Sequence, residues 1–182
     1  MAQPLLEFAR SLAKTGAHDV AVDWLRNVPG LPPIVQTLHL LSIAVILGTT
    51  VLLSLRALGW AVPSQQPAEM ARRLAPWTWG ALPVLLLSGG MFVIARPQRY
   101  FTNPVFGLKI AFMLPALVLG ALLYRAAKSD DGQESECRER RSAGAAVTGR
   151  TRLLAGLNLI AWTGVVLAGR WIAYSEYLFP PE

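Results

Sequence analysis

The chain has 182 residues, of which 53% are hydrophobic and only 15% are charged, and its formal net charge is +6. A soluble domain of this length does not need so much apolar content, so the composition favours a membrane protein. The basic residues flank apolar runs and form no aromatic-basic platform, so we expect no nucleic-acid partner. The single cysteine, Cys137, excludes an intramolecular disulfide.

Residues 1–30 are predicted to form an amphipathic segment that lies on the membrane surface. On a helix, the first apolar residues and the first charged residues fall largely on opposite sides: Leu5, Leu6, Phe8, Ala9, Leu12 and Ala13 against Glu7, Arg10 and Lys14. Gly16 is expected to break this helix. A second short interfacial piece follows around Val20 to Leu25, and it carries His18 at its start.

Residues 31–175 are predicted to form a transmembrane domain with four helical spans. A span takes about 20 apolar residues, and four stretches meet this length, at about 33–58, 74–95, 103–124 and 152–174. Pro32 and Pro33 suit the start of the first span, because proline in a first helical turn forfeits no hydrogen bond. The connection before the second span reads as a surface loop with an amphipathic turn or two. Residues 127–151 are charged and turn-rich, which predicts a flexible loop.

The distribution of lysine and arginine predicts the topology. The loops after the first and third spans hold more of them than the opposite side does: Arg56, Arg72, Arg73, Arg125, Lys128, Arg138, Arg140, Arg141, Arg150 and Arg152 against Arg10, Lys14, Arg26, Arg96, Arg99 and Lys109. The positive-inside rule then places both loops in the cytoplasm and both termini outside.

Three basic residues, His39, Lys109 and Arg170, lie within or near the apolar part of the spans, which contain no Asp or Glu in their central stretches. Burying a lysine or arginine in hydrocarbon costs roughly 2.5–3.5 kcal/mol on insertion scales, so such residues usually face an interior or a wet cavity. In the predicted topology all three lie toward the outer face, at the level of Arg96. This pattern predicts an outward-facing polar site that takes an anionic or acceptor-rich partner.

Each of these residues also has a simpler interpretation. Lys109 and Arg170 can extend their charges to the headgroups, and Arg96 can anchor the end of its span. His39 can form a helix–helix hydrogen bond, with Ser42, Thr163 or a backbone carbonyl as the partner, or it can bind a metal or haem.

The residue composition gives little support for a metal site or a catalytic site. A zinc or copper site needs three or four suitable ligands, and the chain offers two histidines, one loop cysteine and four methionines. The second histidine, His18, lies outside the predicted spans. No catalytic triad, phosphate-binding glycine loop or carboxylate pair is visible, so we expect no enzymatic activity.

Three stretches together resemble a family of small bacterial four-helix inner-membrane proteins of unknown function. They are "TLHLLSIAVILGTTVLLSLRALG", "LAPWTWGALPVLLLSGGMFVIARPQRYFTNPVFGLKIAF" and "LNLIAWTGVVLAGRWIAY". The histidine and glycine of the first stretch are also distantly similar to copper-resistance membrane proteins and four-helix b-type cytochromes. Members of the four-helix inner-membrane family often end their third span with a histidine, whereas this chain has Tyr124 and Arg125 there.

The sequence therefore predicts an all-α integral membrane four-helix bundle in the bacterial inner membrane, preceded by an interfacial helix. The first functional hypothesis is a non-enzymatic protein in which His39 and Arg170, supported by Lys109, bind a quinone, a lipid or a partner subunit. The alternatives are an electron carrier with His39 as an axial ligand of haem b, and a copper-handling membrane protein. Glycine-rich helix faces also favour pairing of the chain with itself.

Overall fold

The computed structural model describes residues 2–62, 64–137, 149–172 and 174, and the side chains among them other than those of residues 2 and 129–137. Within these ranges the chain is all-helical and contains no strand. Four of the helices are long and apolar enough to cross a membrane, which confirms the predicted set of long apolar helices. They are α3 (Leu31–Leu58), α4 (Pro67–Ala95), α6 (Pro104–Cys137) and α7 (Gly149–Ile172).

The bounds of the long helices follow from their local sequences. Gly30 and Gly59 flank α3 with φ angles of 80° and 82°, a left-handed conformation that glycine adopts without steric cost. Proline occupies the first turn of α3 and of α4. The helix α4 continues through Pro76 and Pro83, so it includes the amphipathic turns that the sequence placed before the second span.

The helix α6 is longer than the sequence predicted. It continues through Lys128 to Cys137, so it covers the first part of the segment predicted to be a flexible loop. Residues 125–128 are Arg, Ala, Ala and Lys, which are good helix formers, and no proline interrupts them. The remainder of that segment up to residue 148 lies outside the described residues.

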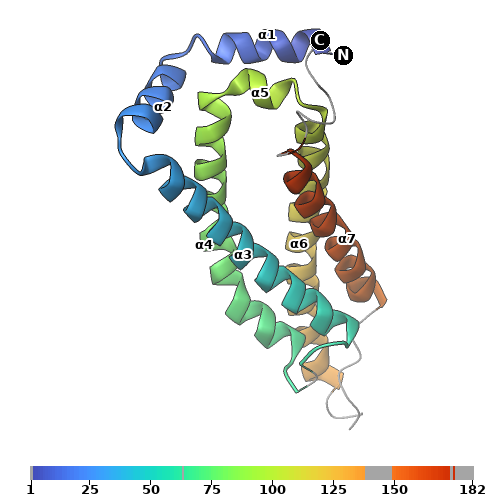
Figure 1. Ribbon diagram of the computed structural model, residues 1–182. Helices are drawn as coiled ribbons and strands as arrows, with labels where there is room; N and C mark the ends of the chain where they lie inside the picture. The colour runs from blue at the N-terminus through green and yellow to red at the C-terminus, as the bar shows by residue number, and fades with distance from the viewer. Residues whose placement is uncertain (1, 63, 138–148, 173, 175–182) are drawn as a thin grey trace.

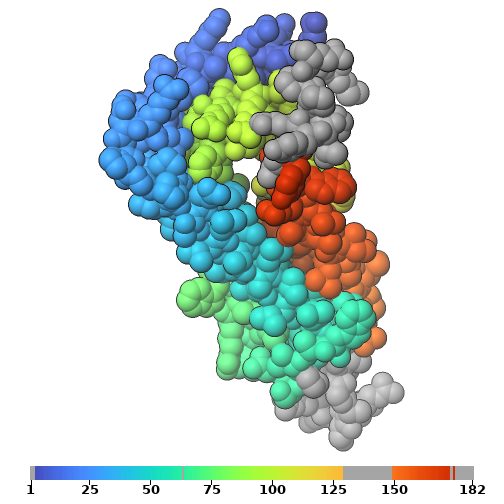
Figure 2. Space-filling model, in the orientation of Figure 1, coloured from blue at the N-terminus to red at the C-terminus, as the bar shows by residue number. Residues whose placement is uncertain are grey.

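The four long helices pack as two antiparallel pairs, α3 with α4 and α6 with α7, and the pairs contact each other through α3 with α7 and α4 with α6. Figure 1 shows that the pairs lie close together near the α3–α4 connection and diverge toward the other end. We call these the closed end and the open end. Figure 2 shows a hollow at the open end, between the outer turns of α3 and α4 on one side and α7 on the other.

Two clusters of buried side chains hold the pairs together. One lies toward the closed end and includes Leu53, Met70 and Leu123. The other lies further along the helices and includes Ile46, Leu85 and Trp162. Nine alanines among the described side chains of the four long helices are buried, which lets the backbones approach closely: Ala57, Ala68, Ala71, Ala95, Ala116, Ala127, Ala155, Ala161 and Ala168.

Three short helices cover the open end: α1 (Ala2–Leu12), α2 (Gly16–Asn27) and α5 (Pro97–Phe101). Helix α1 packs on α5, where the rings of Phe8 and Phe101 meet edge to face with centroids 5.2 Å apart. His18 Nδ1 lies 2.9 Å from the carbonyl oxygen of Ile94 in the last turn of α4. This contact supplies a partner for a helix-end carbonyl and fixes α2 beside α4. The sequence did not predict α5 or the contact of His18.

Candidate functional site

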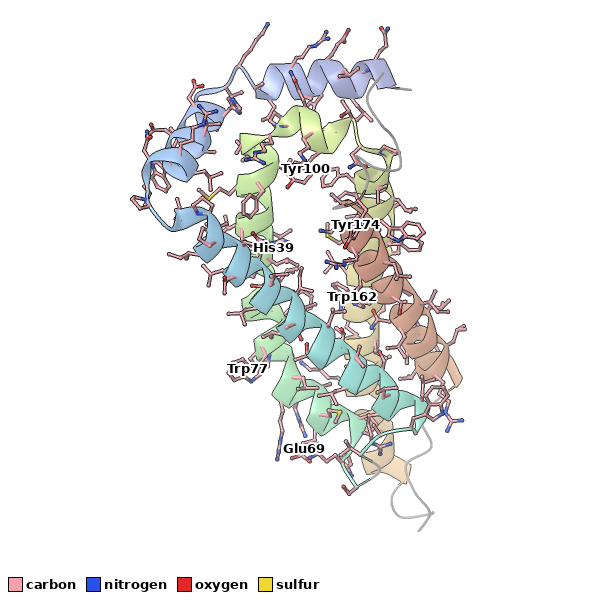
Figure 3. All side chains as sticks on the ribbon, in the orientation of Figure 1. His39, Glu69, Trp77, Tyr100, Trp162 and Tyr174 are labelled. Carbon is pink, nitrogen blue, oxygen red and sulfur yellow. The ribbon has the colours of Figure 1, made fainter. Side chains whose placement is uncertain are left out.

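His39 lies on α3 at the open end, and its ring is held by α4 (Figure 3). Its Nδ1 is 2.9 Å from Ser88 Oγ. The Ser88 hydroxyl lies 2.6 Å from the carbonyl oxygen of Val84, which can only accept, so the single hydroxyl proton points there. Nδ1 of His39 must then donate to Ser88 Oγ. In the neutral ring Nε2 keeps its lone pair, and this atom is therefore able to accept a hydrogen bond or to bind a metal.

Gly89 provides the room for the imidazole. A Cβ at this position would lie 3.0 Å from Cε1 and 3.5 Å from Nδ1 of His39. The neighbouring Gly90 has no atom within 4 Å of the equivalent point. The residue at 89 must therefore be small for the His39–Ser88 contact to form, whereas the residue at 90 faces open space.

Lys109 lies in the open-end part of α6. Its side chain is half-buried. A Cβ at Gly169 of α7 would lie 3.9 Å from Cε and 4.0 Å from Nζ of Lys109. Lys109 of α6 therefore packs against the backbone of α7, whereas His39 of α3 packs against α4.

No carboxylate pairs with Lys109 among the residues that the structure describes. Among the described side chains of α3, α4, α6 and α7, the only acid is Glu69. It lies in the first turn of α4 and pairs with Arg73 at 2.5 Å. In this part of the chain the site thus presents an ammonium group without an anion and an imidazole nitrogen with a lone pair. A complementary ligand carries an acceptor or anionic oxygen for Lys109 and a hydroxyl for His39.

Arg170 is not joined to this pair. Its side chain is exposed, and Nη2 donates to the Tyr174 hydroxyl at 3.1 Å. Its guanidinium carbon lies 5.3 Å from the centroid of the same tyrosine ring. Arg170 directly follows Gly169, the position that Lys109 approaches. Arg96 is exposed and caps the end of α4.

The two side chains named as partners for His39 from the sequence form hydrogen bonds elsewhere. Ser42 donates to the carbonyl oxygen of Leu38, and Thr163 donates to that of Leu159, each at 2.8 Å. Serine and threonine inside helices commonly satisfy themselves in this way. The actual partner, Ser88, precedes two glycines. The "SGG" stretch is the only sequence signal that marks a side chain entering α4 there.

A second polar cluster lies toward the closed end, in the interior. The hydroxyls of Tyr124, Thr78 and Thr49 form a chain in which each neighbouring pair is 2.7 Å apart. Asn158 is fully buried and donates from Nδ2 to Ser54 Oγ at 3.2 Å. The sequence placed Asn158 among the helices but did not predict this cluster.

No group of three or more histidine, cysteine, aspartate or glutamate side chains that could hold a metal ion exists in the part of the chain that the structure describes. No protein-family model, curated protein or solved structure matches the chain. Its function is therefore argued from its own residues.

Proposed function

We propose that the chain is a multi-pass protein of the bacterial inner membrane, in which α3, α4, α6 and α7 form a four-helix transmembrane bundle. The length and composition of these helices support this placement. The helix turns at the closed end hold Arg56, Arg72, Arg73, Arg125, Lys128, Arg150 and Arg152, and α1, α2 and α5 lie at the open end. The positive-inside rule assigns the closed end to the cytoplasm and the open end, with the N-terminal helices, to the outer face.

We further propose that the open end binds an amphiphilic ligand whose polar head reaches His39 and Lys109. The observation that carries this proposal is the half-buried ammonium of Lys109, which lies against Gly169 of α7 and which no described carboxylate pairs. Such a charge is costly in a membrane unless a ligand or water compensates it. Quinols and hydroxyl-bearing lipids combine an oxygen acceptor for Lys109 with a donor for His39 Nε2. Arg170 and Tyr174 stand at the entrance as a second contact for the head.

Binding can be tested by thermal unfolding of the purified full chain, with a short-chain quinol and phosphatidylglycerol as the probes. A ligand present at 100 times its Kd stabilises the folded state by about 2.7 kcal/mol. We expect one probe to raise the unfolding temperature of the wild type, and to raise that of Lys109→Met much less. Lys128→Met, on the exposed face of α6, is the matched control and should respond like the wild type. An equal response of all three proteins to both probes would refute the site.

The alternative of a b-type haem protein has one observation in its favour. His39 is held through Nδ1, which leaves Nε2 as the nitrogen that could bind iron, and metal-binding histidines are usually fixed through their other nitrogen in this way. A visible spectrum of protein purified after expression with ample haem tests this alternative. An absorption band that shifts on reduction and is lost in His39→Ala would favour the cytochrome over the amphiphile site.

A further inference from the structure

The α6–α7 side of the open end carries two cations at one level. Lys109 lies in the second turn of α6, and its Nζ would be 4.0 Å from a Cβ at Gly169 of α7. Arg170 directly follows that glycine, in the last turn of α7. No carboxylate among the described residues pairs with either cation. The two positive charges therefore lie at one stretch of α7 without a described protein anion between them.

Tyr174 adds a hydroxyl donor to these cations. Arg170 Nη2 donates to the Tyr174 oxygen at 3.1 Å, so the proton of that hydroxyl stays available for another acceptor. The guanidinium has further N–H groups, and the ammonium of Lys109 can only donate. We call Lys109, Arg170 and Tyr174 the donor group. Figure 3 shows Tyr174 on the α7 side of the hollow, across from His39.

The donor group favours a phosphate over the other heads that fit the open end. A quinol carries no charge, so it would leave both cations uncompensated in the membrane. A zwitterionic head would bring a further cation to the site. The phosphate of an anionic lipid carries negative charge on oxygens that an arginine binds in bidentate geometry and a lysine binds as a point charge.

The surroundings of the donor group indicate that the phosphate belongs to a lipid. Both cations lie within helices that are long and apolar enough to cross a membrane. Leu108 beside Lys109, and Leu167 and Trp171 near Arg170 on α7, are 44%, 55% and 55% exposed. A free phosphate would have to leave water for this apolar surface, whereas a phospholipid brings acyl chains that pack against it.

We propose that the ligand of the open end is an anionic phospholipid whose phosphate binds Lys109 and Arg170. This assignment rests on the proposed amphiphile site and names the chemical class of its ligand. It also gives Arg170 a role in selectivity, because a second cation distinguishes an anionic head from a neutral one. Phosphatidylglycerol is the simplest probe of this class.

Selectivity can be measured by native mass spectrometry of the purified full chain, with phosphatidylglycerol and phosphatidylcholine of identical acyl chains added in equal amounts. We expect the wild type to retain phosphatidylglycerol preferentially. Arg170→Met should weaken the binding of phosphatidylglycerol by about tenfold or more, because it removes a hydrogen bond between charged groups. Arg170→Gln serves the same purpose if Arg170→Met does not fold. Arg152→Met, at an exposed arginine in the first turn of the same helix, is the matched control and should bind like the wild type.

Two results would overturn the assignment of an anionic phospholipid. One is equal retention of the two phospholipids by the wild type. The other is equal binding of phosphatidylglycerol by Arg170→Met and Arg152→Met. Inorganic phosphate is a further probe, and displacement of phosphatidylglycerol by phosphate of the same affinity would also overturn the assignment, because a free anion would then be sufficient.

Lys109→Met and a short-chain quinol separate the class of ligand from the existence of the site. Loss of phosphatidylglycerol from both Lys109→Met and Arg170→Met is the expected result. Binding of the quinol but of neither phospholipid, with loss in Lys109→Met, would overturn the phospholipid and leave the amphiphile site standing. If no probe binds in a way that depends on Lys109, both the phospholipid and the amphiphile site are overturned.

Discussion

Replacement of Gly164 by alanine should push α6 away from α7 where Phe112 packs against this glycine. A Cβ at this position would lie 2.7 Å from Cδ1 and 2.8 Å from Cγ of Phe112, which is closer than real Cβ contacts allow. Overpacking of this kind typically costs about 1–3 kcal/mol. Gly156 lies on the same helix and has no atom within 4 Å of the point that a new methyl would occupy, so Gly156→Ala is the matched control.

The two variants gain the same helix propensity, about 1 kcal/mol for glycine to alanine in a helix interior. The difference between them therefore isolates the clash with Phe112. We expect Gly164→Ala to be less stable than Gly156→Ala by about 1–3 kcal/mol in the free energy of unfolding. Reversible unfolding in mixed micelles with increasing sodium dodecyl sulfate, followed by circular dichroism, measures this difference.

The clash also predicts rescue when its partner is removed. Phe112→Ala deletes the ring atoms that the new methyl meets, so Gly164→Ala should cost little further stability in the Phe112→Ala background, and the coupling energy between the two sites should be about as large as the clash itself. Equal stability of Gly164→Ala and Gly156→Ala, or a double variant that only adds the two single losses, would refute the close packing of α6 on α7.

Three further predictions concern the two polar sites and the topology. Gly89→Ala should displace the His39 ring by a few tenths of an ångström and reduce ligand-induced thermal stabilisation. Gly90→Ala should leave this stabilisation unchanged, because the residue at 90 faces open space. Equal responses of the two variants would contradict the placement of the ring. Tyr124→Phe removes a buried hydroxyl donor and should lower the free energy of unfolding by about 0.5–1.5 kcal/mol, whereas Tyr100→Phe should be nearly neutral; a neutral Tyr124→Phe would contradict the hydroxyl chain. A membrane-impermeant thiol reagent should label Cys137 only after cells are opened, and labelling in intact spheroplasts would reverse the topology.

The long apolar helices could be predicted from the sequence because each exceeds the bilayer length and is bounded by proline, glycine or charged residues. Their ends were less predictable. Residues 127–137 begin a charged, turn-rich segment that was predicted to be a loop, yet α6 continues through them, and the good helix formers at 125–128 lead into this extension. Helix α5 was not predicted because five residues between two longer helices leave no periodic pattern.

The candidate site was predictable only in part. An ionisable residue in an apolar run is conspicuous, so His39 and Lys109 could be found by their chemistry. What each of them packs against depends on how the helices meet, which no pattern within a single span reveals. Ser88 and Tyr124 carry no charge and resemble other span residues, and only the packing of α4 against α3 and α6 gives them their roles. Arg170 has the same sequence signal as Lys109, but in the structure its partner is Tyr174, one turn further along the chain.

The most direct test of the proposed amphiphile site is mass spectrometry of the small molecules that co-purify with the full chain in a mild detergent. Wild type, Lys109→Met and Lys128→Met should be extracted and compared at equal protein amounts. We predict one amphiphile in near-stoichiometric amount with the wild type and with Lys128→Met, and its loss from Lys109→Met. Indistinguishable extracts from the three proteins would contradict a ligand site at Lys109 and His39.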